Sequence, residues 1–177
     1  MLAIWARRFL DSLPKVDAPH VLAAMTHTIH DEFDYVGRLS GPPQRPLETL
    51  RLGRGTCRDF AVLMMEAVRS LGLAARFVSG YVYVPPRETS GVTRSGGGNT
   101  HAWVRVFLPH GGWAEYDPTN GLVGNRDLIR VAVVRDPAQA TPLSGVWDGK
   151  PEDYLGMDVE VEVKVESPGR TRLETGQ

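Results

Sequence analysis

The segment from Cys57 to Leu71 constrains the fold most, because apolar residues recur along it at the spacing of one helix face. That stripe consists of Phe60, Leu63, Met64, Ala67, Val68 and Leu71, while Ala61, Val62 and Met65 add apolar surface on other faces. Gly72 follows as a natural helix stop. The segment therefore predicts a helix that is central and largely buried.

Helical patterns precede this central helix and strand patterns follow it. The sequence predicts helices over residues 5–13, stopped by Pro14, and 19–33, with a loop of two glycines and three prolines over 37–46. Segments rich in β-branched and aromatic residues predict strands over 76–84, 101–108, 113–116, 128–134 and 159–165. Because helices come first and strands later, the sequence predicts an α+β fold.

Size and composition fit one soluble domain. The 177 residues include 42% hydrophobic and 23% charged residues, and the formal net charge is −1. We expect a single domain over residues 1–166 and a disordered tail over 167–177. The balanced charge argues against nucleic acid as a partner, and no stretch approaches the roughly 20 apolar residues of a membrane span. The sequence leaves the oligomeric state open.

Cys57 is the only cysteine, so it forms neither an intramolecular disulfide nor a cysteine zinc cluster. A reducing, cytoplasmic setting is the simplest expectation. No secretory signal is evident, because Arg7 and Arg8 interrupt the apolar run at the N-terminus.

The position of Cys57 at the predicted start of the central helix favours a nucleophile. Unpaired backbone N–H groups and the helix dipole stabilise an anion there, and the thiolate is the reactive form of cysteine. The same N–H groups could hold the oxyanion of a tetrahedral intermediate. Gly53 and Gly55 permit a sharp turn and a close substrate backbone, and Arg58 is adjacent. The alternative is a buried structural cysteine.

A cysteine nucleophile needs a histidine to accept its proton, and His101 fits best of the five histidines. It opens a predicted strand, with Trp103 on the same face as an aromatic wall that excludes water. His110 falls in a predicted hairpin turn. A metal-dependent hydrolase built on His27, His30 and Asp31 is the weakest alternative, because no further ligand pattern follows.

The predicted hairpin also indicates which acidic residue orients His101. The strand after the turn ends at Asp117, and the start of one hairpin strand lies opposite the end of the other. Asp117 should therefore lie next to His101, held in an extended conformation by Pro118. The alternative is an aspartate that initiates a turn before proline.

These segments together resemble the transglutaminase-like superfamily over about residues 20–166. The matching stretches are GTCRDFAVLMMEAVRSLGLAARFVSGYV, THAWVRVFLPHGGWAEYDPTNG and VAVVRDPAQATPLSGV. A helix cysteine, then R-x-V-S-G-Y, H-A-W and G-W-x-x-x-D-P-T-N in that order, is far more specific than C-x-D-F alone.

The resemblance implies a papain-like α+β fold in which the cysteine helix packs against an antiparallel sheet that carries histidine and aspartate. It implies a triad of Cys57, His101 and Asp117 that forms a thioester from a peptide or protein amide, with no metal or organic cofactor. Either water or an amine then resolves the thioester, and we prefer hydrolysis because water is always present. We expect the substrate contacts to include Gly55, Arg58 and Trp103.

The chain also departs from the family pattern. Arg58 stands where bacterial relatives often carry glutamine, and Asp136-Pro137-Ala138 replaces an aromatic-containing segment. Bacterial relatives usually carry an extra N-terminal β domain, so we expect either a short member of the family or the product of a truncated reading frame. The oxyanion tryptophan of the animal enzymes has no assigned counterpart, since Trp5 is the only tryptophan before Cys57.

Two further expectations concern the site as a whole. The polar loop over residues 85–99 has the length of a functional lid or of a mobile connection. A catalytically silent scaffold that keeps the fold is the main functional alternative to an enzyme.

Overall fold

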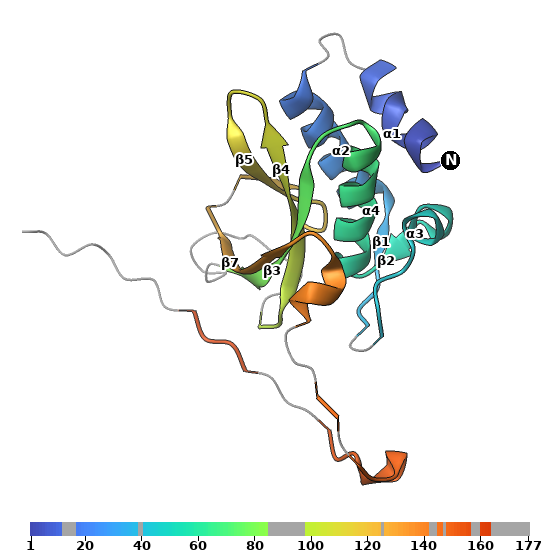
Figure 1. Cartoon of the computed structure of the whole chain (residues 1–177), viewed down its shortest axis with the longest axis vertical. Coiled ribbons are helices and arrows are strands. Elements are labelled where there is room, and N and C mark those ends of the chain that lie inside the picture. The colour runs from blue at the N-terminus through green and yellow to red at the C-terminus, as the bar shows by residue number, and fades with distance from the viewer. Residues whose placement is uncertain are drawn as a thin grey trace, which may run out of the picture.

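Helices gather on one face of an antiparallel sheet (Figure 1). The structure, a computed structural model, describes residues 1–11, 17–38, 41–84, 98–124, 126–141, 145–146, 148–156 and 160–163. The helices come first along the chain and the main sheet follows, which confirms the predicted α+β class.

Helix α4 (Cys57–Ser70) is the centre of the fold. Most of its side chains are buried, and α1 (Leu2–Asp11), α2 (Ala18–Glu32), α3 (Pro46–Leu52) and the sheet pack around it. Gly72 follows it with a φ of 86°, a left-handed conformation that glycine adopts without strain. The prediction of a buried central helix is confirmed.

The main sheet has the strand order β6-β5-β4-β3-β7, and every neighbouring pair is antiparallel. Its strands are β3 (Ala75–Val82), β4 (His101–Leu108), β5 (Gly112–Asp117), β6 (Leu122–Val123) and β7 (Leu128–Val134). Alternate residues of the central strand β4, Ala102, Val104 and Val106, join α4 in the main core. Trp103 belongs to a second, smaller cluster with Val78, Val82 and Leu128.

Strands β4 and β5 form the predicted hairpin. Leu108 pairs with Gly112, and the exposed His110 in the turn has a φ of 70°. The register continues to Val104 opposite Tyr116, so the start of β4 lies near the end of β5.

Several short elements were not expected from the sequence. They are α3, β6, a two-stranded parallel sheet of β1 (Asp34–Tyr35) and β2 (Arg54–Gly55), and 3₁₀ turns at Pro137–Ala140 and Pro151–Asp153. A strand of two residues is too short to show a period in the sequence.

The strand expected over 159–165 is wrong where the structure describes it, because residues 160–163 belong to no strand. The exposure still alternates, with Glu160 and Glu162 exposed and Val161 and Val163 partly buried. Alternation follows from any extended backbone, whereas a strand also needs a hydrogen-bonding neighbour.

Two predicted segments lie outside the described residues: the tail over 167–177, and the loop over 85–99 apart from Gly98 and Asn99. Among the helices that the structure describes, none has both the length and the apolar character needed to cross a bilayer.

Candidate active site

Cys57 is the first residue of α4, directly after the capping residue Thr56. The Asp59 carboxylate accepts hydrogen bonds from the Thr56 backbone N–H at 2.8 Å and from the Thr56 hydroxyl at 2.9 Å, which fixes the chain before the cysteine. The N–H of a first helical residue has no acceptor within its own helix. Cys57 is 8% exposed, so only a small part of it reaches the surface.

His101 and Asp117 meet at the open end of the β4–β5 hairpin. The imidazole Nε2 lies 2.8 Å from the Asp117 Oδ2, and both side chains are buried. The hairpin register, which ends with Val104 opposite Tyr116, brings the start of β4 near the end of β5 and so allows this contact.

The turn after β5 holds the Asp117 carboxylate on both oxygens. The Thr119 N–H donates to Oδ1 at 2.9 Å, and the Asn120 N–H donates to the same oxygen at 3.3 Å. The Asn120 side-chain amide donates to Oδ2 at 2.8 Å, and its nitrogen lies 3.3 Å from Nε2 of His101. Asn120 belongs to the D-P-T-N motif, but its side-chain contact with the triad was not predicted from the sequence.

Burial disfavours charge on both groups, but their mutual attraction outweighs burial. Burial lowers the pKa of His101, whereas the charge and hydrogen bond of Asp117, followed by Cys57, raise it to about 10. Burial raises the pKa of Asp117, whereas His101, Asn120 and the Thr119 backbone bring it below its usual value. The site therefore favours an imidazolium paired with a carboxylate at neutral pH.

The second imidazole nitrogen is the one available to the sulfur. Nδ1 of His101 is buried and makes no hydrogen bond of ordinary geometry within the described residues. Cys57 nevertheless contributes to the raised pKa of His101, so the sulfur lies within electrostatic reach of the ring. The structure thus brings His101 into contact with Asp117 and places Cys57 within electrostatic reach of the imidazole.

Trp103 lies beside His101 but is closed to solvent. It is fully buried, and its ring stacks on the imidazole with centroids 6.0 Å apart and planes at 27°. Its indole N–H donates to Glu115 at 2.7 Å, and Arg130 donates to the same carboxylate at 2.9 Å. The expectation that Trp103 contacts substrate is therefore corrected: the indole packs against His101 and has no open surface for a ligand.

Gly55 lies in β2, against the first turn of α4. A Cβ at this position would lie 2.8 Å from Cβ of Asp59 and 3.3 Å from Cε1 of Phe60. Packing alone thus requires glycine here, and the expected substrate contact of Gly55 stays a prediction.

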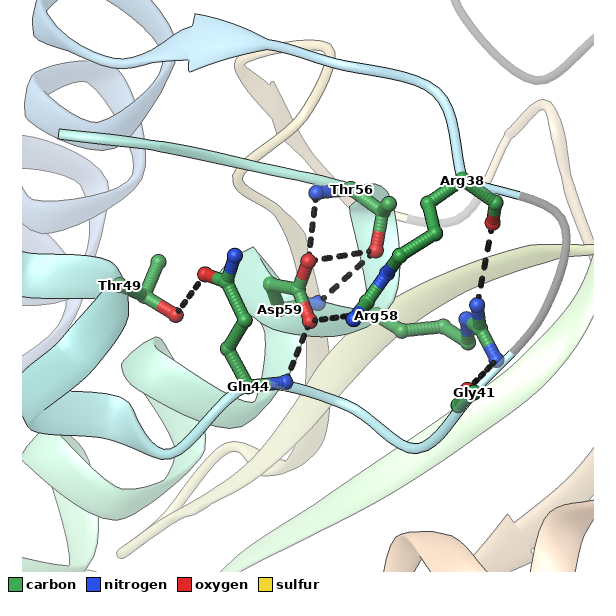
Figure 2. Close-up of polar contacts among 7 residues, drawn as sticks. All are labelled: Arg38, Gly41, Gln44, Thr49, Thr56, Arg58 and Asp59. Atoms are coloured by element: carbon green, nitrogen blue, oxygen red, sulfur yellow. Dashed lines mark hydrogen bonds and ion pairs between the residues drawn. The ribbon is translucent and has the colours of Figure 1, made fainter. Parts of the chain in front are cut away.

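Arg58 reaches across to the chain that leads into α3 (Figure 2). Its guanidinium donates to the carbonyl oxygens of Gly41 at 3.0 Å and Arg38 at 3.1 Å. Neither acceptor is a carboxylate, so the positive charge next to Cys57 is not neutralised by these bonds. Its expected contact with substrate also stays a prediction.

Asp59 is a buried carboxylate that holds several segments of this region together, and its role was not predicted from the sequence. Besides Thr56, it accepts hydrogen bonds from the Arg38 guanidinium at 2.9 Å and the Gln44 N–H at 2.7 Å (Figure 2). The spacing T-x-x-D at a helix start was the available signal. A cavity of about 310 Å³ lies beside it, lined by Val36, Arg38, Gln44, Arg54, Gly55, Thr56 and Asp59.

The histidines of α2 contact the turn after β5. Nδ1 of His30 lies 2.9 Å from the carbonyl oxygen of Thr119, and both His27 and His30 border Gly121. In the part of the chain that the structure describes, no three His, Cys, Asp or Glu side chains gather as metal ligands. The metal alternative of His27, His30 and Asp31 thus finds no ligand set there.

Known proteins resemble this chain in sequence. An uncharacterized protein of Mycobacterium leprae is 34% identical over 140 residues, which cover 79% of this chain and 49% of that protein. An uncharacterized protein of Mycobacterium tuberculosis is 34% identical over 156 residues, 85% of this chain and 49% of that protein. The chain therefore spans about half the length of the curated relatives it matches.

Solved structures share the fold. A crystal structure from Cytophaga hutchinsonii matches with a TM-score of 0.62 and 25% identity, over 79% of this chain and 44% of that one. Legionella pneumophila LapG matches with a TM-score of 0.55 and 16% identity, over 73% of this chain and 71% of that one. The predicted fold, a cysteine-bearing helix packed on an antiparallel sheet, is confirmed.

The sequence profile of the transglutaminase-like superfamily matches residues 11–118, a range that contains Cys57, His101 and Asp117. The same range holds α4 and the β4–β5 hairpin, the two elements that carry these side chains. On this match and on the shared fold, the chain belongs to the transglutaminase-like superfamily.

Proposed function

We propose that this protein is a cysteine-dependent enzyme that acts on amide bonds through a thioester on Cys57. One observation carries the proposal: His101 is held through Nε2 by the buried Asp117, while its Nδ1 makes no hydrogen bond of ordinary geometry within the described residues and the hydrogen bonding and charge of Cys57 act on the ring. A histidine that is oriented by a carboxylate and faces a thiol is the arrangement that activates a cysteine nucleophile.

The proposed reaction starts from a thiolate and an imidazolium. The raised pKa of His101 supports a resting state in which the proton is on the ring. The sulfur attacks the amide carbonyl carbon, and the carbonyl electron pair moves to the oxygen, where the N–H of Cys57 can donate to it. The tetrahedral intermediate then expels the amine, which takes the proton from His101.

Water or an amine completes the cycle. His101, now neutral, removes a proton from the incoming nucleophile, which attacks the thioester carbonyl and releases the thiolate of Cys57. We prefer water as the acceptor because it is always present. The Cytophaga hutchinsonii structure is described as that of a candidate cysteine protease, which also supports hydrolysis. The name of the transglutaminase-like superfamily supports transfer of the acyl group to an amine as the alternative outcome.

The chemistry requires Cys57 as a free thiol. It is the only cysteine of the chain and is free in the structure. A reducing compartment such as the cytoplasm would keep it in that form, so we propose the cytoplasm as the site of action.

Incubation with a peptide library tests the proposal. The library is supplied with and without a biotinylated primary amine, and products are read by mass spectrometry. Shorter peptides in both arms indicate hydrolysis, and biotinylated peptides in the second arm indicate acyl transfer. Cys57→Ala should abolish either product while the circular dichroism spectrum stays that of the wild type.

The same variant separates an enzyme from a silent scaffold. If the wild type and Cys57→Ala give identical product profiles, the proposed chemistry is wrong. A Cys57 that reacts with iodoacetamide only as fast as an ordinary free thiol would then favour the scaffold.

A further inference from the structure

A cysteine attack needs more than a triad, because negative charge develops on the carbonyl oxygen and needs donors. The backbone N–H of Cys57 can supply one donor. Trp5 is the only tryptophan before Cys57, but its ring is buried and packs edge-on against Phe9 within α1, with centroids 5.1 Å apart, so we do not assign it as the other donor. We propose that Tyr35 is the second donor, and that its phenol O–H hydrogen-bonds the carbonyl oxygen of the substrate as Cys57 attacks. This inference rests on the cysteine chemistry proposed above.

The backbone of Tyr35 is tied to the chain that enters α4. In the parallel pair of β1 and β2, Tyr35 lies opposite Gly55, and the N–H of Val36 donates to the Gly55 carbonyl at 2.9 Å. Gly55 is followed by Thr56 and then by Cys57. Neighbouring strands lie about 4.8 Å apart, so this pairing holds Tyr35 close to the residue before the helix cap.

The side chain of Tyr35 is directed toward the first turn of α4. Phe33 and Tyr35 point to the same side of an extended segment, and both rings meet Phe60 edge-on, with centroids 5.9 Å and 6.5 Å apart. Phe60 lies one turn after Cys57, and side chains of a helix lean toward its N-terminus. The Phe60 ring therefore covers the turn that contains Cys57, and Tyr35 packs against that ring.

The hydroxyl of Tyr35 is available to a ligand. The residue is 44% exposed despite its packing on Phe60, and the described residues give its hydroxyl no hydrogen-bond partner. Burial and then Cys57 raise the pKa of the phenol, while Arg58 lowers it, with a net rise. Tyr35 is therefore a protonated donor at neutral pH, within the electrostatic reach of both Cys57 and Arg58.

Two reactions of the same sulfur distinguish a carbonyl donor from other roles. Acylation by p-nitrophenyl acetate passes through an oxyanion, whereas alkylation by iodoacetamide displaces iodide at a saturated carbon and forms none. We expect Tyr35→Phe to acylate about tenfold more slowly, or slower still, and to alkylate at the wild-type rate. The matched control is Tyr154→Phe, since Tyr154 is exposed and directly follows the 3₁₀ turn Pro151–Asp153; both rates should stay unchanged.

The outcomes separate this inference from the proposed function. If the wild type acylates in a Cys57-dependent manner and Tyr35→Phe acylates equally fast, the role of Tyr35 is refuted and the cysteine chemistry stands. An equal loss of both rates also refutes it, because Tyr35 would then act on the thiol or on the fold. If acylation is as fast in Cys57→Ala as in the wild type, the proposed function fails, and the inference with it.

Discussion

Nε2 of His101 lies 2.8 Å from Oδ2 of Asp117, and neither side chain is exposed to solvent. The contact joins the first residue of β4 to the last residue of β5, and its geometry is set by the tight turn between these strands. Since water cannot screen a buried pair, each group strongly changes the proton affinity of the other.

Replacement of Asp117 by asparagine should therefore impair the base. The neutral amide removes the charge that raises the pKa of His101, and it does not hold the same tautomer. We expect kcat to fall by on the order of 10² to 10⁴ and the pKa of His101, measured by NMR titration, to fall as well. Asp153→Asn, an exposed site in a 3₁₀ turn, serves as the control. An unchanged titration of His101 would show that Asp117 does not govern the imidazole.

The same pair makes stability depend on pH. His101 binds its proton more tightly in the folded state, so its contribution is fully present below its ordinary pKa of 6.5 and is lost as the pH rises through about 10. The contribution of Asp117 is present above its ordinary pKa of 3.8 and is lost as the pH falls through its lower folded value.

Urea unfolding of the wild type and of His101→Gln tests the contribution of His101 to the pH dependence of stability. The difference in unfolding free energy between the two proteins should shrink between about pH 6 and about pH 9.5. A difference that stays constant over this range would contradict a raised pKa of His101.

Glu115 should contribute to the stability of the fold. Its carboxylate is 2% exposed and accepts from Trp103 at 2.7 Å and Arg130 at 2.9 Å, with Arg105 at 3.4 Å. Glu115→Ala leaves the buried indole N–H unpaired and should cost about 2–4 kcal/mol of unfolding free energy, measured by urea denaturation. Glu115→Gln keeps an acceptor for Trp103 and should cost less. Equal costs would mean that the hydrogen bond to Trp103 contributes little.

Gly55→Ala should disturb the start of α4. The added methyl would lie 2.8 Å from Cβ of Asp59, and this overlap should cost about 1–3 kcal/mol and reduce activity. Gly37→Ala is a matched control, because its Cβ would meet no atom within 4 Å, and it should stay within about 0.5 kcal/mol of the wild type. A thermal melt of each variant, together with its turnover, checks both expectations. Similar behaviour of the two variants would contradict the packing role of Gly55.

Much of this protein could be predicted from the sequence alone, because the signals were local. The helical spacing of apolar residues in α4 predicted that this helix is buried. The β-branched and aromatic residues of β4 predicted a strand with the observed bounds, His101–Leu108. The tight turn set the hairpin register, and with it the meeting of His101 and Asp117. The spacing of apolar residues and the residues of a tight turn involve only a few neighbouring positions, so both can be predicted directly from the sequence.

Only the tertiary structure decided what surrounds the site. The parallel pairing that sets Tyr35 beside Gly55 involves two-residue strands from separate parts of the chain, and no local sequence pattern predicts it. The same holds for Arg38 and Gln44 on Asp59, and for Trp103, whose burial depends on β3 and β7. Such contacts depend on how separate elements pack, and packing is settled by the whole chain rather than by any one segment.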